Sequence, residues 1–190
     1  MNGAPTPPHR LGDDGTALLT MLTKCDADSW CNMWQKYNAT MTRETFFGFF
    51  EGNQGETLSH PWGTAAIPAI VQGVVGVTPT SPEYATFKIK PRLGGAAAKG
   101  GLQRVSLLVP TLRGPIAVNV SVAADGKSHY TVSATISCST WASVCVPQEA
   151  GPELTLDGKP ALAVKDGRHM CVEHVGCGTG GAARVVATTA

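Results

Sequence analysis

Glu44 lies beside a cluster of aromatic residues in the segment TRETFFGFFEGNQGETLSHPWGTA, which runs from residue 42 to residue 65. After a glycine-rich gap, the same segment carries His60 and Trp62 in a His-Pro-Trp triplet. Aromatic neighbours raise the pKa of a glutamate by desolvation, which makes it a better general base while it stays ionised. Flat rings can pack against the C–H faces of a sugar, and a histidine can hydrogen-bond to its hydroxyl groups. The segment therefore suits a carbohydrate site, although Glu44 taken alone is better explained as a cap or a solvated residue of a helix.

The chain before residue 78 has apolar residues at helical spacing, and we expect four helices there. Asp28 and Ser29 are candidate N-caps of the second helix, and Glu44 lies on the third. Pro68, in the fourth, is tolerable only in the first turn or at a kink. The apolar faces of the four helices are formed by Leu18, Leu19 and Leu22; by Trp30, Met33, Trp34 and Tyr37; by Phe46, Phe47, Phe49 and Phe50; and by Ile67, Ile70, Val71, Val74 and Val75.

After residue 78 the chain changes to short β-branched runs between turn residues, which is typical of strands. The runs are ATFKIKP, RVSLLVP, PIAVNVSVA, HYTVSATIS, ASVCVP, ELTLDGKPALAV, HMCVEH and ARVVAT. Apolar and polar residues alternate in several of them, as in half-buried antiparallel strands, and the turn signal DGK occurs at Asp125 and Asp157. About eight such strands predict a β-sandwich or jelly roll rather than a βαβ fold.

The charge balance argues against two classes of partner. Fifteen basic and fourteen acidic residues give a formal net charge of +1, without runs of like charge, so nucleic acid and anionic membrane surfaces are not expected to bind. No apolar run approaches the ~20 residues of a membrane-spanning helix, and the start MNGAPTPPHR lacks the apolar segment of a signal peptide. A soluble protein is expected, and its compartment stays open, since six cysteines also suit secretion.

The six cysteines form three local pairs along the chain: Cys25 with Cys31, Cys138 with Cys145, and Cys171 with Cys177. Sequence alone cannot choose among the pairings, and we expect a first bridge between Cys138 and Cys145. Zinc is not expected, because the cysteine and histidine spacings do not match tetrahedral zinc sites. No cofactor is expected either, since the sequence has no phosphate-binding glycine loop.

Three blocks in order resemble the C-terminal part of the inverting α-L-rhamnosidases of bacterial and fungal type. These blocks are DSWCNMWQKYNATMTRETF, LSHPWGTAAIPAIVQGVVGV and the exit TPTSPEYATFKIKPRLG. The resemblance continues through VPTLRGPIAVNVSV, STWASVCVP and LDGKPALAV, and covers the chain from about residue 11 onward. It implies an α+β arrangement: residues 1–77 as the last helices of an (α/α)6 catalytic barrel, and residues 78–190 as the antiparallel β-sandwich that closes those enzymes.

The resemblance also assigns roles to individual residues. Glu44 stands where the family has its catalytic general base, and His60 where the family has a histidine that lines the sugar pocket. Trp62 lies beside that histidine, and it suits two roles equally: packing between helices and a flat surface for the sugar ring. Trp34 is expected in the core with its helix neighbours, but it is also kept as a candidate sugar contact. The family has tryptophans where this chain has Arg43 and Phe46, so the shape of the pocket around Glu44 is expected to differ.

The resemblance implies a substrate that contains L-rhamnose, a glycoside or a polysaccharide, and hydrolysis with inversion. It also places the general acid upstream, in a stretch for which this chain has no counterpart. We therefore expect the 190-residue chain not to hydrolyse rhamnosides by itself and to self-associate through exposed barrel helices. An incomplete gene model of a longer enzyme and a real truncated product would both explain this, and the first is favoured.

Two readings without catalysis stay open. In the first, the chain is a carbohydrate-binding module in which the sandwich, His60 and Trp62 hold a sugar. In the second, the β-sandwich is a packing domain without a ligand. Replacing Glu44 with glutamine in a chain that contains its barrel separates these readings from the enzymatic one, because only an enzyme would lose turnover.

Overall fold

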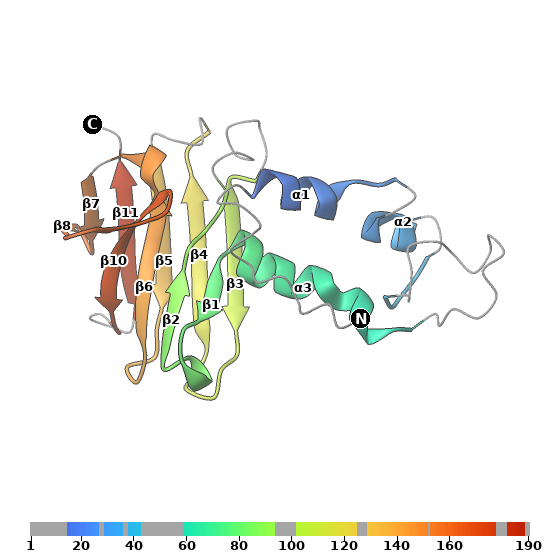
Figure 1. Ribbon diagram of the computed structural model, residues 1–190, viewed down its shortest axis with the longest axis horizontal. Helices are drawn as coiled ribbons and strands as arrows, with labels where there is room; N and C mark the ends of the chain where they lie inside the picture. Colours follow the sequence, from blue (N-terminus) through green and yellow to red (C-terminus); the bar gives the residue numbers. More distant parts are fainter. Residues whose placement is uncertain are drawn as a thin grey trace.

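Helices occupy the first third of the chain and strands the remainder, as the change of sequence pattern near residue 78 predicts (Figure 1). The computed structural model describes residues 15–26, 29–35, 38–42, 59–93, 102–124, 129–151, 153–177 and 182–188. The strands form two sheets, and the helical part extends from one side of them (Figure 1).

Three of the four expected helices fall within the described residues. The helical elements before residue 78 are α1 (Thr16–Thr23), α2 (Trp30–Gln35), the 3₁₀-helix η3 (Pro61–Ala65), α3 (Ala66–Pro68) and the π-helix η4 (Ala69–Val74), and two 3₁₀-helices, η5 (Pro82–Tyr84) and η6 (Gln148–Ala150), lie among the strands. The predicted N-cap of α2 is confirmed for Ser29, whose Oγ accepts a hydrogen bond from the backbone N–H of Asn32 at 3.2 Å. The third expected helix, with Glu44, and the other candidate cap, Asp28, lie outside the described residues.

The fourth expected helix is a run of three helical types, and its apolar stripe is only half buried. Its type changes from α to π directly after Pro68, which has no backbone N–H to donate. Val74 and Val75 are buried, but Ile67 and Ile70 are 61% and 38% exposed. The sandwich core includes only the C-terminal end of this run, so the first half of its apolar stripe stays exposed.

All eight predicted strand segments contain strands. The strands are β1 (Val77–Pro79), β2 (Thr86–Ile89), β3 (Arg104–Val109), β4 (Ile116–Val122), β5 (His129–Thr135), β6 (Trp141–Pro147), β7 (Glu153–Leu156), β8 (Lys159–Pro160), β9 (Val164–Asp166), β10 (His169–Val175) and β11 (Ala182–Thr188). The sequence did not predict β1, and it joined β7, β8 and the start of β9 into one segment. The predicted hairpin at Asp157 is confirmed, with φ of 52° there and 79° at Gly158; the one at Asp125 lies outside the described residues.

The two sheets have the orders β1-β2-β6-β10-β9 and β3-β4-β5-β11-β7-β8. One neighbouring pair, β2 and β6, is parallel, which corrects the expectation of a purely antiparallel sandwich. The chain leaves the first sheet after β2, forms β3, β4 and β5 in the second, and re-enters the first as β6 in the same direction. A crossover of this length permits parallel pairing, which a short hairpin cannot form.

Alternation along the strands builds a core between the sheets. In β4, Ile116, Val118, Val120 and Val122 are all buried, while Asn119 between them is exposed. In the first sheet, the buried apolar side chains that join this core are Val77, Phe87, Ile89, Ala142, Val144, Val146, Val172 and Val175. Leu18 of α1 and Val74 at the end of η4 belong to the same apolar cluster, so the core continues from the sandwich into the helices.

Backbone contacts join the helical part to β1 and β2. Gly76 has φ of +77°, and its carbonyl accepts a hydrogen bond from the Lys90 N–H at 3.1 Å. A Cβ added at Gly76 would lie 2.0 Å from the Lys90 carbonyl oxygen, so only glycine fits there. The Arg92 guanidinium donates to the carbonyls of Gln72 and Gly73 at 2.8 and 3.2 Å, which satisfies acceptors at the end of η4.

The structure pairs the cysteines as Cys25–Cys31, Cys138–Cys177 and Cys145–Cys171. The predicted bridge between Cys138 and Cys145 is therefore wrong. Cys145 on β6 is bonded to its direct register partner on β10, Cys171, and Cys138 before β6 is bonded to Cys177 after β10. Antiparallel strands bring together residues that are distant in sequence, so the two bridges are nested. Spacing along the chain carries no information on this pairing.

Candidate functional site

Glu44 itself lies outside the described residues, but the segment that leads to it is held beside His60. The His60 backbone N–H donates to the Thr42 carbonyl at 2.8 Å, and the Thr42 hydroxyl donates to the His60 carbonyl at 2.9 Å. Ser59 Oγ lies 3.4 Å from Met41 Sδ in the same contact. The chain two residues before Glu44 is thus tied to the chain that carries the predicted pocket histidine.

Helix α2 is attached to the same place. The Trp30 indole N–H donates to the Gly63 carbonyl in η3 at 2.8 Å, which joins the first helical segments to the His-Pro-Trp triplet. The disulfide Cys25–Cys31 fixes the start of α2, and Cys31 is buried. Helix α2 and residues 38–42 are therefore both tied to the more distant residues 59–65, which include His60.

Exposure separates the members of the α2 stripe. Trp30 and Met33 are buried, as expected of core residues, whereas Trp34 is 51% exposed. The expectation that Trp34 packs in the core is therefore wrong among the described residues. An exposed indole is suited to contact a ligand or another part of a protein. The candidate role of Trp34 as a sugar contact stays a prediction.

The other two predicted residues are placed less fully. His60 is half-buried and immediately precedes η3, in an extended backbone conformation. Trp62 lies within η3, and its side chain is outside what the structure describes. The structure therefore brings His60, the backbone of Trp62 and the approach to Glu44 together, and it leaves Trp34 on the outside of the neighbouring helix.

A second polar region, which the sequence did not single out, covers the outer face of the first sheet. Asp166 accepts hydrogen bonds from the ammonium groups of Lys88 and Lys90 at 2.6 and 3.5 Å. These contacts, led by the hydrogen bond from Lys88, hold the pKa of the Asp166 carboxyl below its usual range. The alternation in FKIK already directs Lys88 to the face opposite Phe87 and Ile89, but the partner on β9 depends on the tertiary structure.

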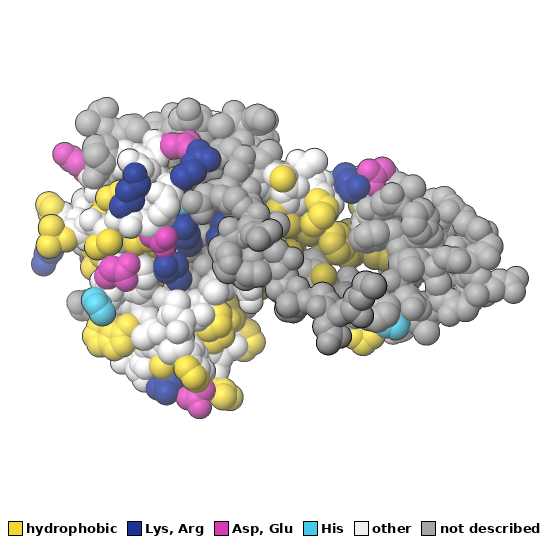
Figure 2. All heavy atoms as spheres, in the orientation of Figure 1, with side chains coloured by type: hydrophobic (Ala, Val, Ile, Leu, Met, Phe, Trp, Pro, Cys, Tyr) yellow, Lys and Arg dark blue, Asp and Glu magenta, His cyan; other side chains and the backbone are white. Residues whose placement is uncertain are grey.

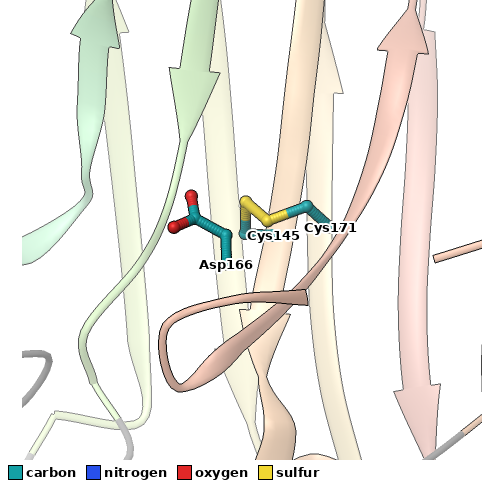
Figure 3. A group of neighbouring side chains, drawn as sticks. All are labelled: Cys145, Asp166 and Cys171. Atoms are coloured by element: carbon teal, nitrogen blue, oxygen red, sulfur yellow. A yellow bond between two sulfur atoms is a disulfide. The ribbon is translucent and has the colours of Figure 1, made fainter. Parts of the chain in front are cut away.

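Asp166 also lies next to the disulfide of Cys145 and Cys171, with potential ligand atoms of the three residues within 4.8 Å of one another (Figure 3). The two sulfur atoms are bonded to each other, so neither is available as the thiolate that a metal ion would need. The carboxylate points away from the sulfur atoms (Figure 3). We therefore read this group as a disulfide beside an ion pair.

None of the helices among the described residues is long and apolar enough to cross a membrane. No protein-family model matches the chain, and no curated protein sequence matches it.

Solved structures do match. A Streptomyces avermitilis α-L-rhamnosidase, solved in complex with L-rhamnose, superposes with a TM-score of 0.66 at 17% identity, over 88% of this chain and 16% of that one. The α-L-rhamnosidase from Dictyoglumus thermophilum gives 0.68 at 12% identity, over 90% and 18%. The enzyme from Aspergillus terreus gives 0.56 at 20% identity, over 83% and 16%. The chain thus spans less than a fifth of each enzyme, and over that length it has a rhamnosidase-like fold.

Proposed function

We propose that this chain is the C-terminal part of an inverting α-L-rhamnosidase. In this proposal, residues 1–77 are the last helices of the (α/α)6 barrel and residues 78–190 are the closing β-sandwich. The observation that carries it is the fold match over 83–90% of the chain, which includes helical and sheet regions together. Three such matches to enzymes of one activity are more specific than a β-sandwich alone, which many unrelated proteins share.

Glu44 is the proposed general base, which deprotonates the water that attacks the anomeric carbon. An inverting mechanism needs a second, protonated carboxyl roughly 6.5–9.5 Å away, with room for the water between them. In this proposal the acid lies in an upstream part of the enzyme, as the family resemblance implies, and the chain matches only 16–18% of the length of its structural neighbours. His60 would hydrogen-bond to sugar hydroxyls, and Trp62 and Trp34 would offer apolar surface to the sugar ring.

The hydrogen bonds between Thr42 and His60 support this arrangement, because they hold the backbone two residues before Glu44 next to the backbone of the proposed pocket histidine. The exposed Trp34, Ile67 and Ile70 also support it, since helices that belong to a larger barrel have a second apolar face for their neighbours.

The first experiment is to establish the mass of the native protein and the 5′ end of its transcript. We expect a protein several times larger than 19.8 kDa, with further helices before residue 1. In that protein, Glu44→Gln should lower kcat for nitrophenyl α-L-rhamnoside by about 10²–10⁴-fold, the usual contribution of a general base. Glu51→Gln, a nearby glutamate without a proposed role, is the matched control and should keep most of the activity.

A native protein of 19.8 kDa without rhamnosidase activity would contradict the enzymatic proposal. Full activity of the Glu44→Gln variant would contradict the role of Glu44 alone. If the unsubstituted protein showed no turnover and Glu44→Gln changed only its affinity for sugar, the carbohydrate-binding alternative would hold.

A further inference from the structure

We propose that the outer face of the first sheet carries a non-catalytic binding site for a neutral sugar, built around Trp141. Trp141 begins β6 and is 52% exposed, although its neighbours Ala142 and Val144 are buried. The site is separate from the helical residues proposed for catalysis, so the inference does not depend on the proposed function.

The indole lies at the edge of a shallow hollow of about 170 Å³. The polar residues that line it are Ser143 of β6 itself and five from other strands or their ends: Thr80, Thr86, Lys88, Glu173 and His174. Figure 2 shows hydrophobic atoms, a histidine and an acidic side chain close together on this face of the molecule. The arrangement combines one flat apolar surface with hydrogen-bonding groups around it.

The Trp141 indole and its backbone are held in place by neighbouring chain segments. A Cβ added at Gly176 would lie 2.8 Å from Cζ3 of Trp141, so the ring packs directly on the glycine backbone. The disulfide Cys138–Cys177 joins the residue after Gly176 to the turn that precedes Trp141. The Trp141 backbone N–H also donates to the Ala85 carbonyl at 3.0 Å. A ring held in this way loses little conformational entropy when a ligand binds.

A β-bulge brings two polar side chains to the same place. The register of β10 against β6 shifts between Val172 and Val175, with one extra residue on β10. His174, within the bulge, has φ of 56°, a left-handed conformation that costs energy for a residue other than glycine. Glu173 and His174 are both exposed there. Backbone strain of this kind is concentrated at functional sites, where it orients particular side chains.

The hydrogen-bonding groups of the hollow favour a neutral polyol. Ser143 Oγ donates to Glu173 Oε1 at 2.8 Å, and a carboxylate with about four lone-pair positions can accept further hydrogen bonds from sugar hydroxyls. The hydroxyls of Thr80 and Thr86 lie 2.7 Å apart and supply both donors and acceptors. The Glu173 carboxylate would repel an anionic ligand, and the Lys88 ammonium is already engaged by Asp166. A pyranose ring stacked on the indole, with its hydroxyls toward Glu173, satisfies all of these groups.

The test is a titration of the 190-residue chain by NMR, observed at the indole N–H of Trp141. The probes are methyl α-L-rhamnopyranoside and maltotriose as neutral sugars, and glucuronate as an anionic one. We expect a saturable shift with at least one neutral sugar, at a dissociation constant in the millimolar range that is usual for small sugars held by one ring. In Trp141→Ala, which lacks the indole, the backbone signals of the other residues of the hollow should no longer shift with added sugar. Glu173→Gln, which leaves the packing intact, should weaken binding by about tenfold.

Leu162→Ala is the matched control, because Leu162 is an apolar side chain of the sandwich with 96% exposure and no part in the hollow. This variant should bind as the wild type does. The inference is overturned if neither neutral sugar shifts the Trp141 signal, if binding survives in Trp141→Ala at wild-type strength, or if glucuronate alone binds.

Discussion

The β-sandwich and the helical part differ in how far each buries its own apolar surface. In the sandwich, alternating residues of both sheets close one core. One disulfide joins β6 to β10, and a second joins the turn before β6 to the chain after β10. In the helical part, Trp34, Ile67 and Ile70 stay exposed among the described residues. A sheet can close its core against a second sheet of the same chain, whereas these three apolar side chains of the helical part lie at the surface. The sandwich therefore buries the inner faces of its strands, and the helical part exposes apolar residues that another element could cover.

The largest expected effect comes from the disulfides, and it should differ between the two regions. Removing Cys138–Cys177 with paired alanines should lower the free energy of unfolding by about 4 kcal/mol, because a bridge across 39 residues restricts the unfolded chain strongly. Removing Cys25–Cys31, which spans 6 residues, should cost about 2 kcal/mol and act on the helical part. Urea unfolding followed by circular dichroism measures both. Equal losses would show that the two regions are not stabilised differently.

The next test concerns the backbone contact between Gly76 and Lys90, which joins the helical part to the sandwich. Gly76→Ala should cost on the order of 3 kcal/mol, because it combines a left-handed backbone with a Cβ placed 2.0 Å from the Lys90 carbonyl oxygen. Gly158→Ala is the matched control, since Gly158 has a similar φ of +79° but nothing within 4 Å of the added atom. It should cost only about 1–2 kcal/mol, the price of the backbone conformation. Thermal unfolding of the two variants checks the difference, and similar losses would contradict a tight joint.

A smaller effect is expected at the ion pairs of the outer sheet face. The pKa of Asp166 is below its usual range in the folded protein, so the ionised carboxylate stabilises the fold above the ordinary aspartate pKa of about 3.9. This contribution is lost as the pH falls through the lowered pKa. Because Asp166 is 37% exposed, Asp166→Asn should cost less than about 1 kcal/mol at pH 7, and this cost should shrink as the pH falls through the lowered pKa. A constant difference between the two proteins across this pH range would contradict the assignment.

The smallest effect on stability, but a clear one on association, is expected from the exposed apolar residues. We expect the isolated chain to self-associate through its helical part, and Ile67→Ser with Ile70→Ser should shift it toward the monomer mass of 19.8 kDa. The free energy of unfolding should change by no more than about 0.5 kcal/mol. Leu112→Ser with Leu162→Ser removes side chains that are 87% and 96% exposed on the sandwich and should leave association unchanged. Light scattering distinguishes these outcomes, and a monomeric wild-type chain would contradict the prediction.

Local patterns predicted local structure well. The alternation of PIAVNVSVA became β4 with its inner face buried, and the Asp157-Gly158 pair became a hairpin turn. Ser29 caps α2 as its position suggested. Such features depend on residues two to four positions away, so they can be predicted from the order of residues alone. Of the proposed catalytic site, the sequence supplied the candidate residues Glu44, His60, Trp62 and Trp34 and a family resemblance, and the structure added the contacts between Thr42 and His60.

What the sequence by itself determined is the division into a helical and a strand-rich part, the position of most strands and the side chains that each of these strands directs to one face. The tertiary structure alone decided that β2 runs parallel to β6, that Cys138 joins Cys177, and that Glu173, His174 and Trp141 share one hollow. Each of these depends on which distant strands become neighbours and in what register. That choice is set by the packing of whole sheets, to which residues scattered along the full chain contribute together, so no local spacing records it.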